Sequence, residues 1–183
     1  MASVSYGLTK PEDVFEKFKR EGAKLGEKPT TDDIFNFLVT GATLTEWVTK
    51  TFKGIPVIDQ IAASLRSGGK WEHLPLETVA WITDCSCVPN RHCDVRRHIH
   101  NTLQICWDTA GASKHFHWKG SNVREIDSKP IVRDWYQYFT TSRAPDLYID
   151  YAGETYGLSQ VRRILTQYYE GLFAHVRSAG SAS

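Results

Sequence analysis

Histidines and cysteines are concentrated in the middle of this 183-residue sequence. Six of the seven histidines and all four cysteines fall between residues 73 and 117. Imidazole nitrogens and thiolates bind transition metals, and imidazole also transfers protons near neutral pH. Two kinds of chemistry therefore have to be weighed for this segment, namely metal binding and acid–base catalysis.

The cysteines Cys85, Cys87 and Cys93, together with His92 or His98, include the ligand types of a zinc site. Their spacing argues against such a site. Structural zinc sites usually have two or more residues between paired cysteines, whereas one residue separates Cys85 from Cys87 and no second pair follows. We therefore expect no metal and no other cofactor, and interpret the cluster as a polar loop with reduced thiols.

Arg91 and His98 have the spacing of a metal-independent ribonuclease site. The pair resembles the HEPN class of helical toxins and defence nucleases, in which four to six residues separate an arginine from a histidine on a helix. There the arginine would stabilise developing phosphate charge, and the histidine would transfer a proton. Random placement gives about one such match in a sequence of this composition. The alternative interpretation is a solvated basic face, because Arg96 and His100 are one helical turn apart.

A third candidate site consists of Lys114, His115 and His117, which follow the strongest predicted helix. At a corner between a helix and a strand, Lys114 and His115 could bind an anion or pair with Asp108. Alternation along a strand would place His115 and His117 on the same face. In the alternative interpretation, the polar side chains of this corner hydrogen-bond the last carbonyl groups of the helix, which is a structural role.

Aromatic residues dominate the sequence that follows, at Trp135, Tyr136, Tyr138, Phe139, Tyr148, Tyr151 and Tyr156. Aromatic rings beside Arg133 and Arg143 could stack nucleic-acid bases. They also pack a sheet against a helix, and the last predicted helix offers Tyr168, Leu172 and Phe173 for that purpose. We interpret the aromatic run as core packing.

The composition is that of a folded chain without a strong charge bias. There are 22 Lys and Arg against 21 Asp and Glu, which gives a formal charge of +1, and 41% of the residues are hydrophobic. The charge gives no reason to expect an anionic membrane or nucleic acid as the partner of the whole chain. No apolar run approaches the roughly 20 residues of a membrane span, and no secretory signal is recognisable. We expect a cytoplasmic protein without the common phosphate-loop, dinucleotide, serine-hydrolase or zinc-protease signatures.

The hydrophobic spacing predicts an α+β fold in one domain, 1–183, with frayed tails at 1–8 and 178–183. Helices are predicted at about 9–26, 30–54, 57–67, 94–110 and 159–176. The 94–110 helix has the clearest apolar stripe, formed by Val95, Ile99, Leu103, Cys106 and Ala110. A small antiparallel sheet is expected at about 115–156, with a hairpin that turns at 152–153. We also expect most of four large side chains to lie in the core: Phe35, Phe37, Leu44 and Trp47.

Two segments resemble stretches of a group of uncharacterised bacterial proteins. Residues 35–47, FNFLVTGATLTEW, are similar to the group's NFFVTA-x-HL-x-DW, and residues 106–116, CWDTAGASKHF, to its C-R-D-x-A-N-x-S-K-H-F. The resemblance implies a bacterial source and helices followed by strands and a final helix; it implies no activity. Thr43, Trp107 and Gly111 stand where the group has His, Arg and Asn, so chemistry that depends on those residues is not expected here.

Two hypotheses of function follow. The first is a bacterial cytosolic, non-catalytic interaction or binding module that acts through an unknown protein partner or by self-association as a dimer. The second is a metal-independent HEPN-like ribonuclease of a toxin or defence system, which cleaves RNA with Arg91 and His98. The nuclease requires both residues to be exposed together in a cleft or across a two-fold interface, and we expect them at the exposed start of the 94–110 helix.

Overall fold

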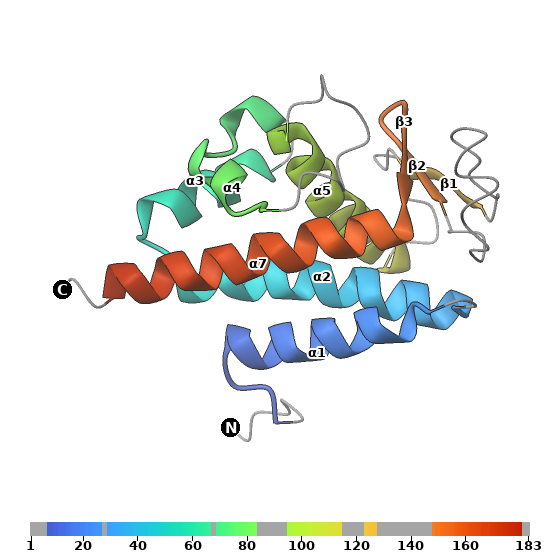
Figure 1. Ribbon diagram of the computed structural model, residues 1–183, viewed down its shortest axis with the longest axis horizontal. Helices are drawn as coiled ribbons and strands as arrows, with labels where there is room; N and C mark the ends of the chain where they lie inside the picture. The colour runs from blue at the N-terminus through green and yellow to red at the C-terminus, as the bar shows by residue number, and fades with distance from the viewer. Residues whose placement is uncertain are drawn as a thin grey trace.

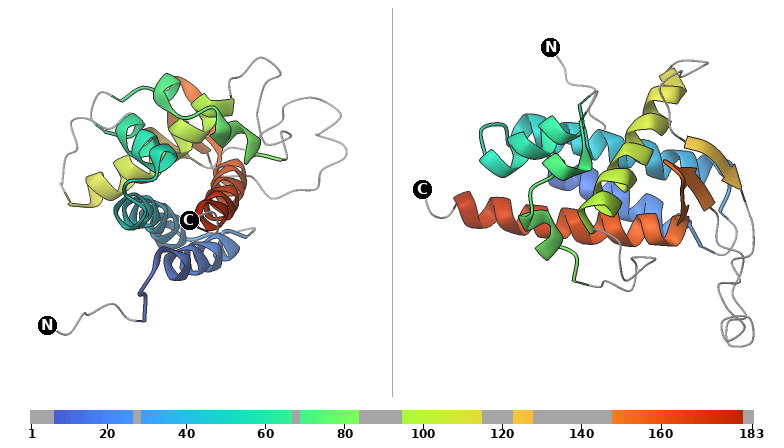
Figure 2. Two further views of the ribbon diagram at one scale, coloured as in Figure 1. Left: turned by 90° about the vertical axis from the view of Figure 1, so that its left-hand side faces the viewer. Right: turned by 90° about the horizontal axis from the view of Figure 1, so that it is seen from above.

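The computed structural model describes residues 7–26, 29–66, 69–83, 95–114, 123–127 and 148–180, with only the backbone described at 112–114 and 123–127. Helix α1 (Pro11–Lys24) packs antiparallel against α2 (Thr31–Thr51) and α7 (Leu158–Gly180) (Figure 1). Helix α5 (Val95–Lys114) crosses these helices and contacts α2 and α7 (Figure 2). No helix within these ranges has the length and apolarity needed to span a bilayer.

Three short helices lie beside α5, above the left half of α7 in Figure 1: α3 (Pro56–Ser64), the 3-10 helix η1 (Trp71–His73) and α4 (Glu77–Ala80). The 3-10 helix contacts both α3 and α5, and α4 contacts α7. Between α2 and α5, the chain therefore passes from a contact with α2 at α3 to a contact with α7 at α4.

A three-stranded antiparallel sheet, in the order β1-β2-β3, lies at the start of α7. Its strands are β1 (Val123–Asp127), β2 (Tyr148–Tyr151) and β3 (Glu154–Gly157). The β2–β3 hairpin turns at Ala152 and Gly153, whose φ angles of 52° and 82° match the two-residue turn that suits the right-handed twist of the strands. Glycine adopts such an angle without strain, whereas Ala152 does so at some conformational cost. The predicted hairpin is confirmed.

The start of α2 is fixed by a reciprocal capping box between Thr30 and Asp33. The Asp33 backbone N–H donates to the Thr30 hydroxyl oxygen at 3.1 Å, while the Thr30 N–H and hydroxyl both donate to the Asp33 carboxylate. The side-chain hydrogen bond from Thr30 lowers the pKa of Asp33. At the start of α1, Asp13 has the same role, because its carboxylate accepts from the backbone N–H groups of Thr9 and Lys10.

The hydrophobic core joins the faces of α1, α2, α5 and α7 that point toward one another. The predicted stripe of α5 is confirmed, since Ile99, Leu103 and Cys106 are at most 2% exposed, and Val95 and Ala110 are partly buried against them. On α2, Phe37 and Leu44 are fully buried and Trp47 is partly buried. The prediction is wrong for Phe35, which is 40% exposed. Its position on α2 points away from the face that meets α1 and α5.

Some boundaries differ from those predicted. Helix α5 passes through Gly111 and ends at Lys114, because one glycine costs a helix only about 1 kcal/mol. Helix α7 continues to Gly180, so 178–180 belong to a helix and not to a frayed tail. Strand β1 falls inside the region predicted to form the sheet. Two further parts of that region, 115–122 and 128–147, lie outside the described residues, as do 1–6 and 181–183.

Helix α5 approaches α2 closely at Gly41. A Cβ atom at this position would lie 2.8 Å from the Cys106 sulfur and 3.3 Å from the Phe18 ring, which is closer than packed atoms allow. Glycine therefore serves here for close helix packing, even though it weakens an isolated helix.

Cys106 is expected to be chemically inert in the folded protein. Burial raises the pKa of its thiol to about 12, so the reactive thiolate is scarce at neutral pH. Iodoacetamide at pH 8 should leave the Cys106 peptide unmodified in the native protein and alkylate it after unfolding in guanidinium chloride, as read by peptide mass spectrometry. Rapid alkylation of Cys106 in the native state would show that solvent reaches its thiol between α2 and α5, which would contradict the tight packing of these helices.

Candidate functional site

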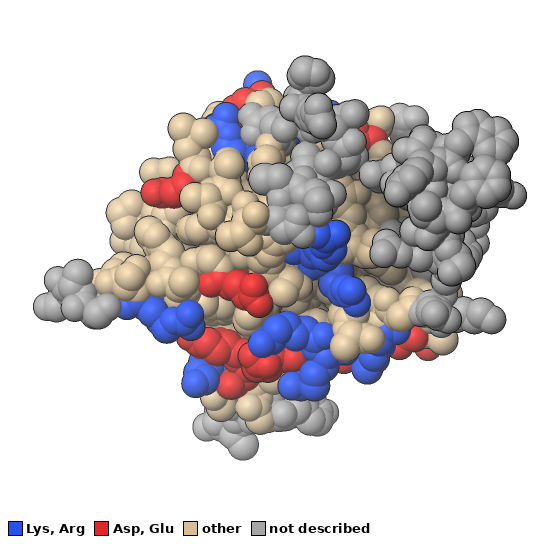
Figure 3. All heavy atoms as spheres, viewed as in Figure 1, with Lys and Arg blue, Asp and Glu red and all other residues tan. Residues whose placement is uncertain are grey.

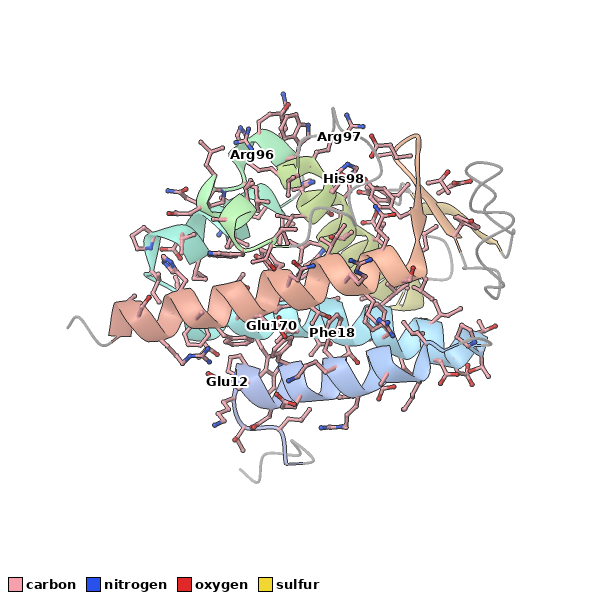
Figure 4. The ribbon with its side chains drawn as sticks, in the orientation of Figure 1. Glu12, Phe18, Arg96, Arg97, His98 and Glu170 are labelled. Atoms are coloured by element: carbon pink, nitrogen blue, oxygen red, sulfur yellow. The ribbon has the colours of Figure 1, made fainter. Side chains whose placement is uncertain are left out.

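The first turns of α5 carry polar side chains to two neighbouring elements (Figure 4). One set, Arg97, His98 and Asn101, meets the β2–β3 hairpin. The other set, Arg96, His100 and Gln104, meets the chain around α3 and η1. This part of α5 includes His98, one of the two residues predicted to be catalytic.

The hairpin set is centred on the hydroxyl group of Tyr156. This hydroxyl donates to Glu154 Oε2 at 2.7 Å and accepts from Asn101 Nδ2 at 2.8 Å. His98 Nδ1 lies 3.1 Å from the same oxygen and 3.8 Å from Glu154 Oε2. The carboxylate is in turn paired with Arg97 at the surface. Glu154 and Tyr156 meet because residues two apart on a strand share a face.

The geometry determines the tautomer of His98. The single hydroxyl hydrogen of Tyr156 is given to Glu154, so the contact with His98 requires Nδ1 to be the donor. In neutral His98 the Nε2 atom then carries the lone pair. A carboxylate and a tyrosine that hold an imidazole in one tautomer are also the arrangement that orients a general base. The cluster therefore has the composition of an acid–base site.

The buried position of His98 distinguishes this cluster from a nuclease site, in which the histidine has to reach the RNA. His98 is 1% exposed, and its Nε2 atom is buried, so the expectation that His98 lies exposed at the start of the helix is wrong. The reason is that the hairpin packs on this side of α5, which the spacing of the helix alone does not reveal. Arg91 lies outside the described residues, and its position relative to His98 is not defined.

The second polar set closes the end of α3. His100 Nε2 donates to the Ser64 carbonyl at 3.0 Å, and Gln104 Nε2 donates to the Leu65 carbonyl at 3.3 Å. These groups satisfy carbonyls that the end of a helix leaves without a partner. Arg96 lies over the Trp71 ring at 5.4 Å. The interpretation of Arg96 and His100 as a solvated face is therefore wrong for His100, which is 7% exposed.

The remaining predicted sites fall largely outside the described residues. Lys114 is the last residue of α5, and its side chain is not described; His115 and His117 lie outside the described ranges. The same holds for the cysteine cluster at 85–93. Among the residues that are described, no group of three or more His, Cys, Asp or Glu side chains could hold a metal ion. The described aromatics Tyr148, Tyr151 and Tyr156 are buried, as core packing predicts.

The outward face of α2 forms a second feature, separate from α5. The positions 32, 35, 36, 39, 43, 46, 47 and 50 are exposed or partly exposed and recur every three or four residues. Within this face, Phe35, Val39, Thr43 and Trp47 are spaced four residues apart and form an apolar stripe. The Thr43 hydroxyl donates to the Val39 carbonyl at 2.9 Å, which leaves its methyl group for contact. We call these four residues the α2 stripe.

Charge is mixed on the face of the molecule drawn in Figure 3. Blue and red side chains alternate there over α1 and α7, and on α1 Lys19 pairs with Glu16 and Lys24 with Glu21. A surface that binds nucleic acid without other help carries a continuous positive patch. The described residues on this face do not form such a patch.

Sequence reasoning missed Tyr156, Glu154 and Asn101 as members of a polar cluster. The alternation in Glu154-Thr155-Tyr156 does place Glu154 and Tyr156 on one face of a strand. No local pattern shows that this face meets α5, because 55 residues separate Asn101 from Tyr156.

No protein-family model, no curated protein and no solved structure matches this chain, so its function has to be inferred from the geometry of its own side chains.

Proposed function

We propose that this chain is a bacterial cytosolic interaction module, which binds a protein partner through the α2 stripe and performs no catalysis. The observation that carries the proposal is the 40% exposure of Phe35, continued along the same face of α2 by the partly exposed Val39, Thr43 and Trp47, the last of which also packs partly against the core. Scattered exposed apolar residues are common on proteins, but a contiguous row of them marks surfaces that are covered by a partner.

The energetic argument concerns Phe35 first. Its ring is 40% exposed, and together with Val39 it lies outside the group of side chains that form the core of the described residues. Removing a large apolar side chain from water contributes about 1.5–3 kcal/mol. Because Phe35 stays partly in contact with water in the folded chain, a partner that covers the α2 stripe would bury it further and so stabilise the complex.

The chemistry of α5 supports the non-catalytic part of the proposal. The imidazoles of His98 and His100 are buried, and each bonds to a neighbouring element of the same chain. A general base has to reach the proton that it removes from a substrate. These histidines instead hold the hairpin and the end of α3 against α5.

The ribonuclease with Arg91 and His98 is the competing proposal, and RNA cleavage separates the two. We expect wild-type protein to leave a single-stranded RNA intact in EDTA, to the same extent as a His98→Asn preparation. Cleavage by the wild type that is lost in both Arg91→Ala and His98→Asn, with the fold retained by circular dichroism, would replace the interaction module with the nuclease.

Site-specific photo-crosslinking tests the interaction surface directly. With p-benzoylphenylalanine at position 35, irradiation of expressing cells should give a discrete protein adduct, because the benzophenone would lie inside the covered surface. The same group at position 16, on the exposed side of α1, is the matched control and should give none. Mass spectrometry then identifies the adduct. Equal labelling at both positions, or no adduct at position 35, would remove the α2 stripe as an interface.

A further inference from the structure

We infer that the partner of the α2 stripe is a second copy of this chain, bound antiparallel about a two-fold axis that passes near the level of Gly41. This inference rests on the proposed function and adds the identity of the partner. Its basis is that the outward face of α2 is complementary to itself when one copy is reversed end for end.

The apolar residues of the face are symmetric about that level. In an antiparallel pair, Phe35 lies at the level of Trp47 of the second copy, and Val39 at the level of Thr43. The two largest side chains therefore stand at the ends of the contact, at the same level on its two flanks, and the two small ones stand near its centre. Small central residues let two helices approach, and the aromatic residues supply most of the buried area.

The polar residues of the face are placed symmetrically about the same level, and the members of each pair can attract each other. Asp32, in the first turn, lies at the level of Lys50 of the second copy, which is in the last turn. Asn36 likewise lies at the level of Glu46, where an amide can donate to a carboxylate. Lys50 bonds Glu46 of its own helix at 2.5 Å and is largely exposed, so it can serve both carboxylates.

Charge also selects the direction of the pair. Parallel helices would place Asp32 against Asp32 and Lys50 against Lys50, which is repulsive. The antiparallel pair avoids this repulsion and aligns the helix dipoles favourably. Helices α1 and α7 both lie on one side of α2 when that helix is seen end-on, so neither of them covers its outward face (Figure 2).

One helix face is a small interface. It falls at the low end of the range for specific complexes, so we expect a reversible dimer with a micromolar dissociation constant. Sedimentation velocity of the full chain, over a protein concentration range of about 1 µM to 1 mM, should show the sedimentation coefficient rise from monomer to dimer.

Charge-swap variants test the geometry. Asp32→Lys and Lys50→Asp should each weaken self-association by at least about tenfold, because each brings like charges together twice per dimer. The double variant, with both changes in one chain, should recover it. An equimolar mixture of the two single variants should form a heterodimer, since its four charges are again complementary. Phe35→Asp should abolish the dimer, whereas Glu16→Lys on α1 is the control and should leave it unchanged.

Each outcome decides the inference. A chain that stays monomeric at 1 mM overturns it, and so does a dimer that Asp32→Lys or Phe35→Asp leaves intact while circular dichroism shows native helix content. If one charge variant fails to fold, Lys50→Asp or the rescue in the double variant still decides. A monomer whose position 35 crosslinks to a different protein would overturn the dimer and leave the proposed function standing. A monomer without any adduct would remove both.

Discussion

Replacing Phe18 by alanine is expected to lower the free energy of unfolding by about 3–5 kcal/mol. Phe18 is 0% exposed and lies between α1 and the other long helices (Figure 4). Its ring stacks on Phe37 at a centroid distance of 4.7 Å and meets the edge of Tyr169 at 5.8 Å. The substitution loses the transfer free energy of the ring and leaves a cavity that these rigid aromatic neighbours cannot close.

Urea unfolding followed by circular dichroism measures this effect, and the melting temperature should fall by about 10 °C. The matched control is Phe35→Ala on α2, which removes the same atoms from a side chain that is 40% exposed. Measured on the monomer at low concentration, it should cost less than about 1 kcal/mol. Equal losses for the two variants would mean that Phe18 and Phe35 are buried alike, which would contradict both the core and the α2 stripe.

Tyr156→Phe is expected to cost about 2–4 kcal/mol, although it removes a single oxygen atom. The hydroxyl is bonded to Glu154, Asn101 and His98, and its loss leaves the two donors on α5 buried without this acceptor. An unsatisfied buried polar group costs about 1–3 kcal/mol, which is more than the net value of the hydrogen bond itself. The hairpin would also lose its main polar attachment to α5.

Tyr168→Phe is the matched control for this prediction. Tyr168 is 1% exposed and packs its ring against Trp81 and Tyr169, and its hydroxyl is not part of the hairpin cluster, so removal of that oxygen should change stability little. Chemical denaturation of both variants gives the comparison. A loss below about 0.5 kcal/mol for Tyr156→Phe would mean that the cluster does not hold the hairpin, and it would reopen a catalytic interpretation of His98.

Local sequence patterns predicted most of the helices and the hairpin. The stripe of α5 requires only that apolar residues recur every three or four positions, and the box at Thr30 and Asp33 requires only residues three apart. The hairpin likewise follows from the alternation on either side of Ala152 and Gly153. In each case the atoms that interact are separated by a few residues, so the sequence contains the whole interaction.

The sequence did not determine how the polar residues of α5 are used. As a pattern, Arg96, His98 and His100 are equally compatible with a basic surface, a nuclease and a buried network. Only the tertiary structure brings Tyr156 to His98 and the Ser64 carbonyl to His100. A histidine can act as a general base only if a substrate can reach it, and it has a structural role if other parts of the chain cover it. Burial depends on how the whole chain packs, so the local sequence does not reveal it.

The same distinction explains the α2 face. The sequence by itself determined that residues 31–51 form a helix with large apolar side chains, because its periodicity and its cap are local. It could not show which of these side chains face the core, since apolar residues occur all around the helix. The packing of α1 and α5 against Phe37 and Leu44 decided that, and it left Phe35 and Val39 facing outward.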